Sequence, residues 1–426
     1  MICSSAARTG RTVEGGRVWR RAFFMLAVVV FAGTTPLGAA GGAGETRAPG
    51  GVATEHTAER QPHHAVRALG TLQERIAHGD DAAITLQTSV ILDISRELKA
   101  YPLEAWSSPR NRQALIKYVL SGGDPGVLQQ LLARKLFEDG EISLAQAAVA
   151  YAQGNRAVVL RHLDKVDAYD LPRSLAGHVA LVKAIVIANS DLRRVIELCD
   201  EARFLSPGTL VEETALRLAI EAALTQGNRA KFEVVANRYL RRFPNSPYLI
   251  SIIPRLAEAI AQARYLEDAA GTRWVQAAAE FLGSNTIVTL FTAVAEAGLR
   301  SSSMVTTLEA ARIAQKHARK GSPEEAWALA YEGSSMVIGS NPAEGLARLD
   351  SAEFIGGSGS MLELIAGARA VATLIQSRPL ESPVDGTKPL LGESPLLQTA
   401  QPGSPDPKEL SARLAQLDRV IGELGE

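Results

Sequence analysis

Side chains that could carry out chemistry are few in this sequence. His63 and His64 are adjacent and His56 is near, a grouping that could bind a metal ion. The chain has only seven His and two Cys, so these histidines have few supporting ligands. The stretch 356–360 resembles a nucleophile elbow but lacks its final glycine, and we interpret it as a linker.

The established catalytic motifs are also missing from the sequence. We find no His-Glu-x-x-His, no paired Cys-x-x-Cys, no phosphate-binding loop and no dinucleotide fingerprint. The pairs Glu212-Glu213 and Glu324-Glu325 are typical of solvated helix surfaces. We therefore predict that the protein is not an enzyme and has no catalytic residues, no metal site and no cofactor.

Two groups of residues are better suited to contact another protein, because tryptophan and arginine are over-represented at binding hot spots. Each group has an alternative: the tryptophan could pack under the next helix, and arginines near a helix C-terminus are favoured by the helix dipole. The candidate partner-binding residues are Trp106, Arg110, Arg112, Arg238, Arg241 and Arg242.

The first 40 residues have the order of a secretory signal peptide. Five arginines precede the apolar run Ala22–Ala32, and small residues follow at Gly38–Ala40. The apolar run is too short to cross a bilayer, which takes ~20 residues in a helix. We predict cleavage near residue 40, a periplasmic protein and no membrane span in the mature chain; an uncleaved membrane anchor is the alternative.

Charge and cysteine content limit the partners of the mature chain. The first 40 residues carry five Arg and one Glu, so removing this +4 from the total of −1 leaves about −5. A mildly acidic protein has no electrostatic reason to bind nucleic acid. Cys199 alone would remain after cleavage, so no internal disulfide can form; its neighbours place it on the buried side of a helix.

Apolar residues repeat every three to four positions along most of the chain, which indicates helices. Prolines and glycines divide them: Pro62 begins and Gly79 ends the first, and Pro109 begins the third. Leu256, Ile260, Trp274, Phe281 and Leu290 are predicted core residues. The run 184–188 is β-branched but belongs to a longer helical period, so we expect no strand.

A repeat is visible between residues 140 and 250. Gln153-Gly154-Asn155-Arg156-Ala157 recurs as Gln226-Gly227-Asn228-Arg229-Ala230, and Pro172, Pro207 and Pro244 mark half that period. The implied unit is close to the tetratricopeptide length. We expect each glycine to end one helix and each asparagine to cap the next.

We therefore predict an all-α fold of tetratricopeptide-like helical hairpins that form a right-handed α-solenoid. Such a stack offers a groove for a partner segment. The predicted domains are a signal peptide (1–40), a flexible segment (41–61), the helical repeat domain (62–376), a Pro-rich disordered linker (377–407) and a C-terminal helix (408–426). In that last helix Leu410, Leu414, Leu417, Val420 and Ile421 form an apolar stripe.

Several segments resemble the chemotaxis and flagellar-motor protein family MotC of rhizobia and their relatives, over roughly residues 62–300. They include Val66–Leu69, Leu72–Asp80, Arg110-Asn111 after Trp106, Leu120–Pro125 and Arg241–Ser246. The resemblance implies a periplasmic motility protein that binds and positions the periplasmic part of the stator protein MotB and is needed for flagellar rotation. It brings no catalytic residues.

Two other functions are compatible with the sequence. Arg242–Tyr248 resembles a phrase common in tetratricopeptide-type envelope-assembly adaptors of the periplasm, and flagellar or cell-wall gene neighbours would distinguish that role. The second is a helical periplasmic enzyme acting on cell-wall glycans, which would require two carboxylates positioned in a cleft.

Overall fold

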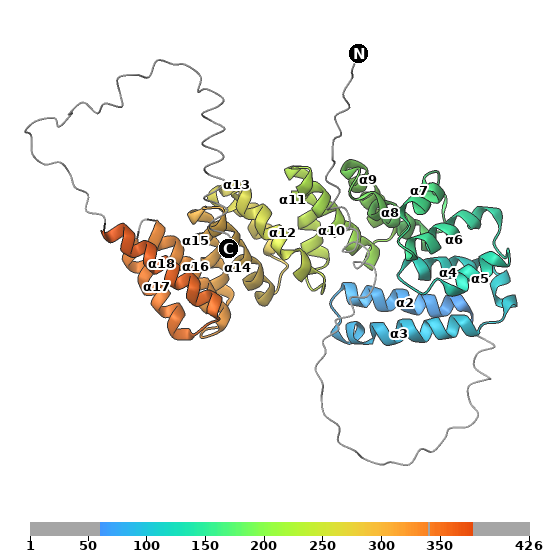
Figure 1. Cartoon of the computed structure of the whole chain (residues 1–426), viewed down its shortest axis with the longest axis horizontal. Coiled ribbons are helices and arrows are strands. Elements are labelled where there is room, and N and C mark those ends of the chain that lie inside the picture. The colour runs from blue at the N-terminus through green and yellow to red at the C-terminus, as the bar shows by residue number, and fades with distance from the viewer. Residues whose placement is uncertain (1–59, 340, 378–426) are drawn as a thin grey trace, which may run out of the picture. The chain divides into compact units, whose positions relative to one another are not determined.

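The computed structural model describes residues 60–339 and 341–377 (Figure 1). Every regular element within those ranges is a helix, so the predicted all-α fold is confirmed. The run 184–188 continues helix α8 and its C-cap instead of forming a strand. The predicted signal peptide, Pro-rich linker and C-terminal helix 408–426 lie outside the described residues, as does nearly all of the segment 41–61.

The first ten helices carry the hairpins that contain the sequence repeat. They are α2 (Pro62–Ala77), α3 (Asp81–Ala100), α4 (Pro109–Leu120), α5 (Gly126–Ala133), α6 (Asp139–Ala152), α7 (Arg156–Leu163), α8 (Arg173–Ile187), α9 (Leu192–Leu205), α10 (Leu210–Thr225) and α11 (Arg229–Arg242). Two 3₁₀ turns, η1 (Leu103–Ser107) and η2 (Ala168–Asp170), join them.

Seven further helices follow beyond the region of clear repetition. They are α12 (Leu249–Gln262), α13 (Ala269–Ala279), α14 (Ser284–Arg300), α15 (Met304–His317), α16 (Pro323–Ile338), α17 (Pro342–Ile355) and α18 (Gly359–Ser377), with the 3₁₀ turn η3 (Tyr265–Glu267) before α13.

The repeated Gly-Asn pairs end and restart helices as predicted. Gly154 and Gly227 have φ angles of 73° and 66°, the left-handed region that glycine enters without steric cost. The Asn155 side chain accepts a hydrogen bond from the Val158 amide, and Asn228 caps the next repeat in the same way. The predicted role of both markers as helix boundaries is therefore confirmed.

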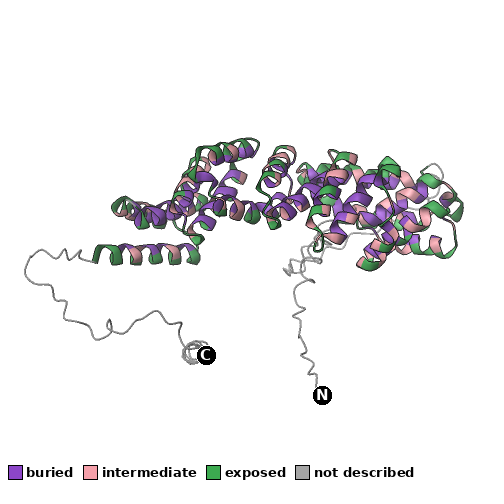
Figure 2. Ribbon diagram, turned by 90° about the horizontal axis from the view of Figure 1, so that it is seen from above, coloured by how far each residue is buried: buried purple, intermediate pink, exposed green. Residues whose placement is uncertain are grey.

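Consecutive helices pack as pairs in both parts of the chain. α8 lies against α9 and α10 against α11, and later α14 pairs with α15 and α16 with α17. Buried residues line the sides that neighbouring helices share (Figure 2). Alanines such as Ala147, Ala148 and Ala180 are almost completely buried at these contacts, so the backbones can approach closely.

The N-terminal helices also contact helices far along the chain. α4 packs against α8, and α2 packs against both α4 and α10. As a result every residue from Leu175 to Val182 in α8 and from Leu210 to Arg217 in α10 is buried. A helix lining an open groove would keep one exposed face, so this stretch offers no open groove to a partner.

The predicted core residues after Pro244 were mostly correct. Leu256, Ile260 and Leu290 are each about 1–3% exposed, and Trp274 packs against the same core while remaining partly exposed. Phe281 was predicted wrongly: it follows the end of α13 and is 43% exposed, whereas its neighbour Leu282 is buried in its place.

Candidate partner-binding site

The first candidate group, Trp106, Arg110 and Arg112, does not form a single surface, because the Arg112 side chain is buried and hydrogen-bonded within the protein. Its Nη2 donates to Glu138 at 2.7 Å and its Nε to Glu141 at 2.6 Å. Its Nη1 donates to the carbonyls of Ser107 and Trp106. Arg112 is 3% exposed, and its guanidinium joins α4 to the start of α6. Few of its hydrogen-bond donors are therefore free for a partner.

Trp106 is buried, whereas Arg110 is exposed to solvent. Trp106 is 2% exposed and meets the Tyr101 ring edge-on, so the packing alternative describes its position. Arg110 lies in the first turn of α4 and is exposed. Of this group, only Arg110 presents its side chain to solvent.

In the second group, Arg238, Arg241 and Arg242, two arginines lie around the buried carboxylate of Glu212, which we predicted from the sequence to be exposed. Glu212 is 0% exposed: Arg242 Nη2 lies 2.8 Å and Arg238 Nε 3.6 Å from its oxygens, and the Gly208 amide donates to it at 2.7 Å. The prediction that Glu212-Glu213 is a solvated surface is therefore wrong. Arg238 and Arg242 of α11 and the Gly208 loop enclose this carboxylate, and the local charge pattern could not reveal those contacts.

The neighbouring carboxylate, Glu213, forms a second buried pair. Arg217, one turn further along α10, donates to both of its oxygens at 2.8–3.0 Å. The Tyr239 and Ser246 hydroxyls donate to the same group at 2.9 and 3.0 Å, and Arg217 also lies 4.8 Å from the centre of the Tyr248 ring. Every charge here has a partner, which burial demands.

The surroundings of Glu213 shift the pKa values of Arg217 and Tyr239. Burial alone would lower the pKa of Arg217, but the charge and hydrogen bonds of Glu213 outweigh it and leave the pKa raised. Burial and the Glu213 charge raise the pKa of the Tyr239 hydroxyl. Both groups therefore keep their ordinary charge states, and the pair acts as a structural element.

The α2–α3 loop docks onto the segment after α11. His78 Nε2 lies 3.2 Å from the Gly208 carbonyl, and the His78 and Phe243 rings are 5.4 Å apart. Gly79 has φ of 86°, and a Cβ there would come 2.3 Å from the Asn245 carbonyl oxygen. Two segments that carried the family resemblance, Leu72–Asp80 and Arg241–Ser246, are thus neighbours in space although distant in sequence.

The three arginines of α11 therefore differ in their surroundings. The side chains of Arg238 and Arg242 are 41% and 36% exposed, with their charged ends directed at Glu212. Arg241 lies in the last turn of α11 and is exposed. The structure brings Arg238 and Arg242 together around one carboxylate and leaves Arg241 on the surface beside them.

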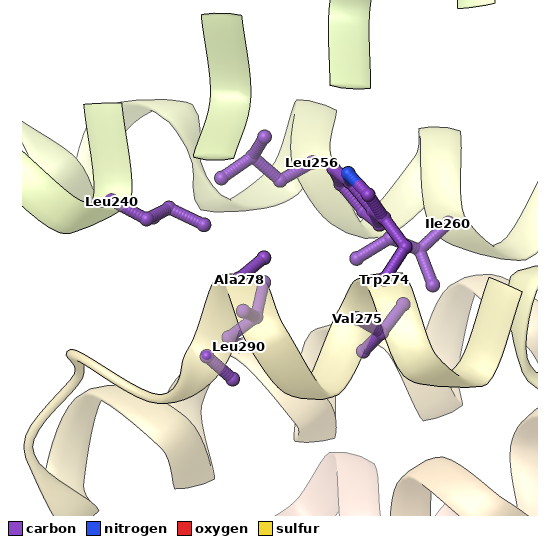
Figure 3. A pocket seen from close by; sticks show the side chains of 8 residues that line it. Leu240, Leu256, Ile260, Trp274, Val275, Ala278 and Leu290 are labelled. Atoms are coloured by element: carbon purple, nitrogen blue, oxygen red, sulfur yellow. The ribbon is translucent and has the colours of Figure 1, made fainter. Parts of the chain in front are cut away.

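An apolar hollow lies where α11, α12, α13 and α14 meet (Figure 3). The side chains of Leu240, Leu256, Trp274 and Val275 point into it from three of these helices. Its interior is about 10 Å³, hardly more than one water molecule needs, and its lining is almost entirely apolar. The hollow is a packing imperfection between these helices and has no room for a substrate.

Residues with reactive groups are also placed for packing. Cys199 is fully buried, as predicted, and burial raises the pKa of its thiol. His63 Nδ1 lies 2.7 Å from the Asn111 side chain. Within the described ranges no three metal-binding side chains gather, and none of the helices there is long and apolar enough to cross a bilayer.

These features define an all-α protein of packed helical hairpins in which buried charges join neighbouring helices. The profile of the family described as chemotaxis protein MotC matches residues 17–420, and the chain belongs to that family. A chemotaxis protein MotC of Rhizobium meliloti (strain 1021) is 26% identical over 357 residues, covering 82% of this chain and 81% of the relative. No solved structure shows significant similarity to the chain.

Proposed function

We propose that this protein acts in flagellar motility by binding and positioning the periplasmic part of a MotB-type stator protein. The family match over residues 17–420 is the observation that carries the proposal. It fits the fold, because stacked helical hairpins provide extended binding surfaces without a reactive centre. We expect the hairpins to follow the right-handed, tetratricopeptide-like arrangement that the repeat length indicates.

The proposed location is the periplasm, after cleavage of a signal peptide near residue 40. The support comes from the sequence, in which a basic start, a short apolar run and small residues follow one another. Amino-terminal sequencing of the protein from a periplasmic fraction would test this location directly.

The partner surface must lie away from the buried faces of α8 and α10. Helices α2 and α4 already cover those faces, so an extended segment cannot bind there without displacing them. The exposed arginines Arg110 and Arg241 are the candidates that remain available, and a guanidinium at such a position would suit an acidic segment of the partner.

The adaptor alternative receives no support from the structure. Phe243 and Ser246 belong to the segment that resembles envelope-assembly adaptors, and both are buried. Phe243 contacts His78 of the α2–α3 loop, and Ser246 donates a hydrogen bond to Glu213. Their role here is internal.

Deletion of the gene should abolish swimming while flagella still assemble, which motility plates and electron microscopy would measure. Complementation with Arg241→Glu should restore less swimming than the wild-type gene, since charge reversal repels an acidic partner. Arg134→Glu is the matched control, an exposed arginine that also lies at the C-terminal end of a helix. Normal swimming of the deletion strain would refute the motor role.

Binding is tested separately by capturing the purified periplasmic part of MotB with the mature chain. Arg241→Glu should weaken capture by about tenfold, the size of a 1.4 kcal/mol interaction, and Arg134→Glu should not. Equal capture by both variants would remove Arg241 from the site, and no capture by the wild-type chain would overturn the proposed partner.

A further inference from the structure

The last described helix, α18, has an outer surface that is unusually poor in charge. Its 19 residues contain only two charged side chains, Glu363 and Arg369. Arg369 Nη2 is directed at α17, 2.7 Å from Asp350 and 2.6 Å from Glu353. Glu363 is therefore the only charge on the side of α18 that faces away from α17.

One side of α18 is buried against the preceding pair. Met361, Ile365, Ala368 and Ala372 are at most 6% exposed and join the apolar core formed by α16 and α17. On a helix of 3.6 residues per turn these positions make one stripe, so the opposite side points away from the stack. That side carries the exposed residues Leu362, Ala366, Gly367 and Ala370.

Such a surface is unexpected at the end of a helical stack. Terminal units of repeat proteins need a polar outer face to stay soluble. Here Leu362 is 43% exposed, and Phe354, in the last turn of α17, is 91% exposed. The small side chains of Ala366, Gly367 and Ala370 would let another helix approach the backbone closely.

The chain itself supplies a matching segment beyond α18. Leu410, Leu414, Leu417, Ile421 and Leu424 are spaced four, three, four and three residues apart, the pattern of a helix with a single apolar seam. Lys408, Arg413 and Arg419 lie outside that seam. If this segment covered α18, its charged side would become the polar end of the stack.

The connection between α18 and this segment is long enough. Residues 378–407 would span about 100 Å when fully extended, whereas α18 is about 28 Å long. A tether of this kind keeps its end at an effective concentration near the millimolar range, which favours binding within one chain over binding between chains.

We propose that residues 408–424 dock as a helix on the outer side of α18, with their leucine seam on Leu362, Ala366 and Ala370. The docked segment completes the stack and replaces an apolar end by a charged one.

Hydrogen exchange of the full mature chain tests the proposal. Leu414→Asp/Leu417→Asp places charges in the seam and should speed amide exchange in 359–377 by about tenfold. Ala412→Asp/Gln416→Asp adds the same charge on the other side of the segment and should leave exchange unchanged. Equal exchange in all three proteins would overturn the proposal. So would protection that rises with protein concentration together with dimers in light scattering, because a second copy would then be the occupant.

A cysteine pair provides an independent measurement, since the native Cys199 is buried. Ala370→Cys/Leu417→Cys should form a disulfide within one chain on mild oxidation, and Ala370→Cys/Ala412→Cys should form several-fold less. Equal yields, or bonds only between chains, would contradict the proposed contact.

Discussion

Helices α2–α11 and helices α12–α18 bury their apolar sides through different kinds of contact. In α2–α11, helices distant in sequence meet: α2 contacts α10 and α4 contacts α8. In α12–α18, the main contacts are between helices close in chain order, such as α14 with α15 and α16 with α17. The first part is therefore closed on itself, and the second behaves as an open stack in which each unit depends on its neighbours.

The buried carboxylates differ in how far their cations are removed from water. Glu213 and Arg217 in the closed part are at most 1% exposed and pair only with groups of the protein. Glu332 on α16 is also buried, but its partners Arg312 and Arg348 have side chains 48% and 38% exposed. Glu213 is thus paired with a cation that is buried as deeply as itself, whereas Glu332, like Glu212 in the first part, is paired with arginines that keep contact with water.

The largest expected effect comes from breaking the fully buried pair. Arg217→Met should lower the free energy of unfolding of the α2–α11 part by about 3–5 kcal/mol, because Glu213 would remain as a buried charge without its cation. Urea denaturation followed by circular dichroism measures the loss.

Glu296 and Arg300 on α14 provide the matched control. They form a Glu-Arg pair with the same four-residue spacing, but on an exposed surface, so Arg300→Met should change stability little. Similar losses in the two variants would mean that the closed part does not depend on its buried ions.

Gly79→Ala should have the next largest effect, about 2–4 kcal/mol. Part of this cost is left-handed strain, and the rest is the clash of the new methyl group with Asn245. Gly227→Ala carries the strain alone, since no atom lies within 4 Å of its added Cβ. If both variants lost the same stability in denaturant titrations, loop docking would contribute nothing.

Acid should weaken the closed part through His178 of α8. Burial, with a smaller contribution from the charge of Lys117, lowers the pKa of this imidazole to about 3. The unfolded chain binds a proton near pH 6.5 and the folded chain does not, so stability falls as the pH drops below 6.5. Between pH 7.5 and 5 the loss should be about 1–2 kcal/mol. His178→Gln should show a correspondingly smaller pH dependence in parallel titrations, and an identical slope would show that folding does not shift the pKa of His178.

Local structure was predictable from sequence because it depends on nearby residues. Gly154 and Asn155 end one helix and cap the next through contacts within four positions, so the sequence pattern specifies them directly. The same holds for Pro109 at the start of α4 and for the buried stripe that includes Cys199.

Long-range contacts could not be predicted in this way. Glu212-Glu213 looks like a solvated surface until the side chains of α11 are brought to it, and Arg112 looks available until Glu138 and Glu141 are brought to it. For the candidate site residues, sequence reasoning could not give the partners that Arg112, Arg238 and Arg242 have inside the protein. The pairing of Leu72–Asp80 with Arg241–Ser246 was visible only as two separate segments of family resemblance.

The docking of the α2–α3 loop has a consequence for how the chain matures. His78 meets a partner 130 residues further on, so the α2–α3 hairpin cannot make all of its contacts until α10 and α11 have been synthesised. During that interval the part of its apolar side that meets α10 remains exposed and vulnerable to aggregation. The N-terminal hairpin should therefore be where folding finishes, and where a chaperone would be needed longest.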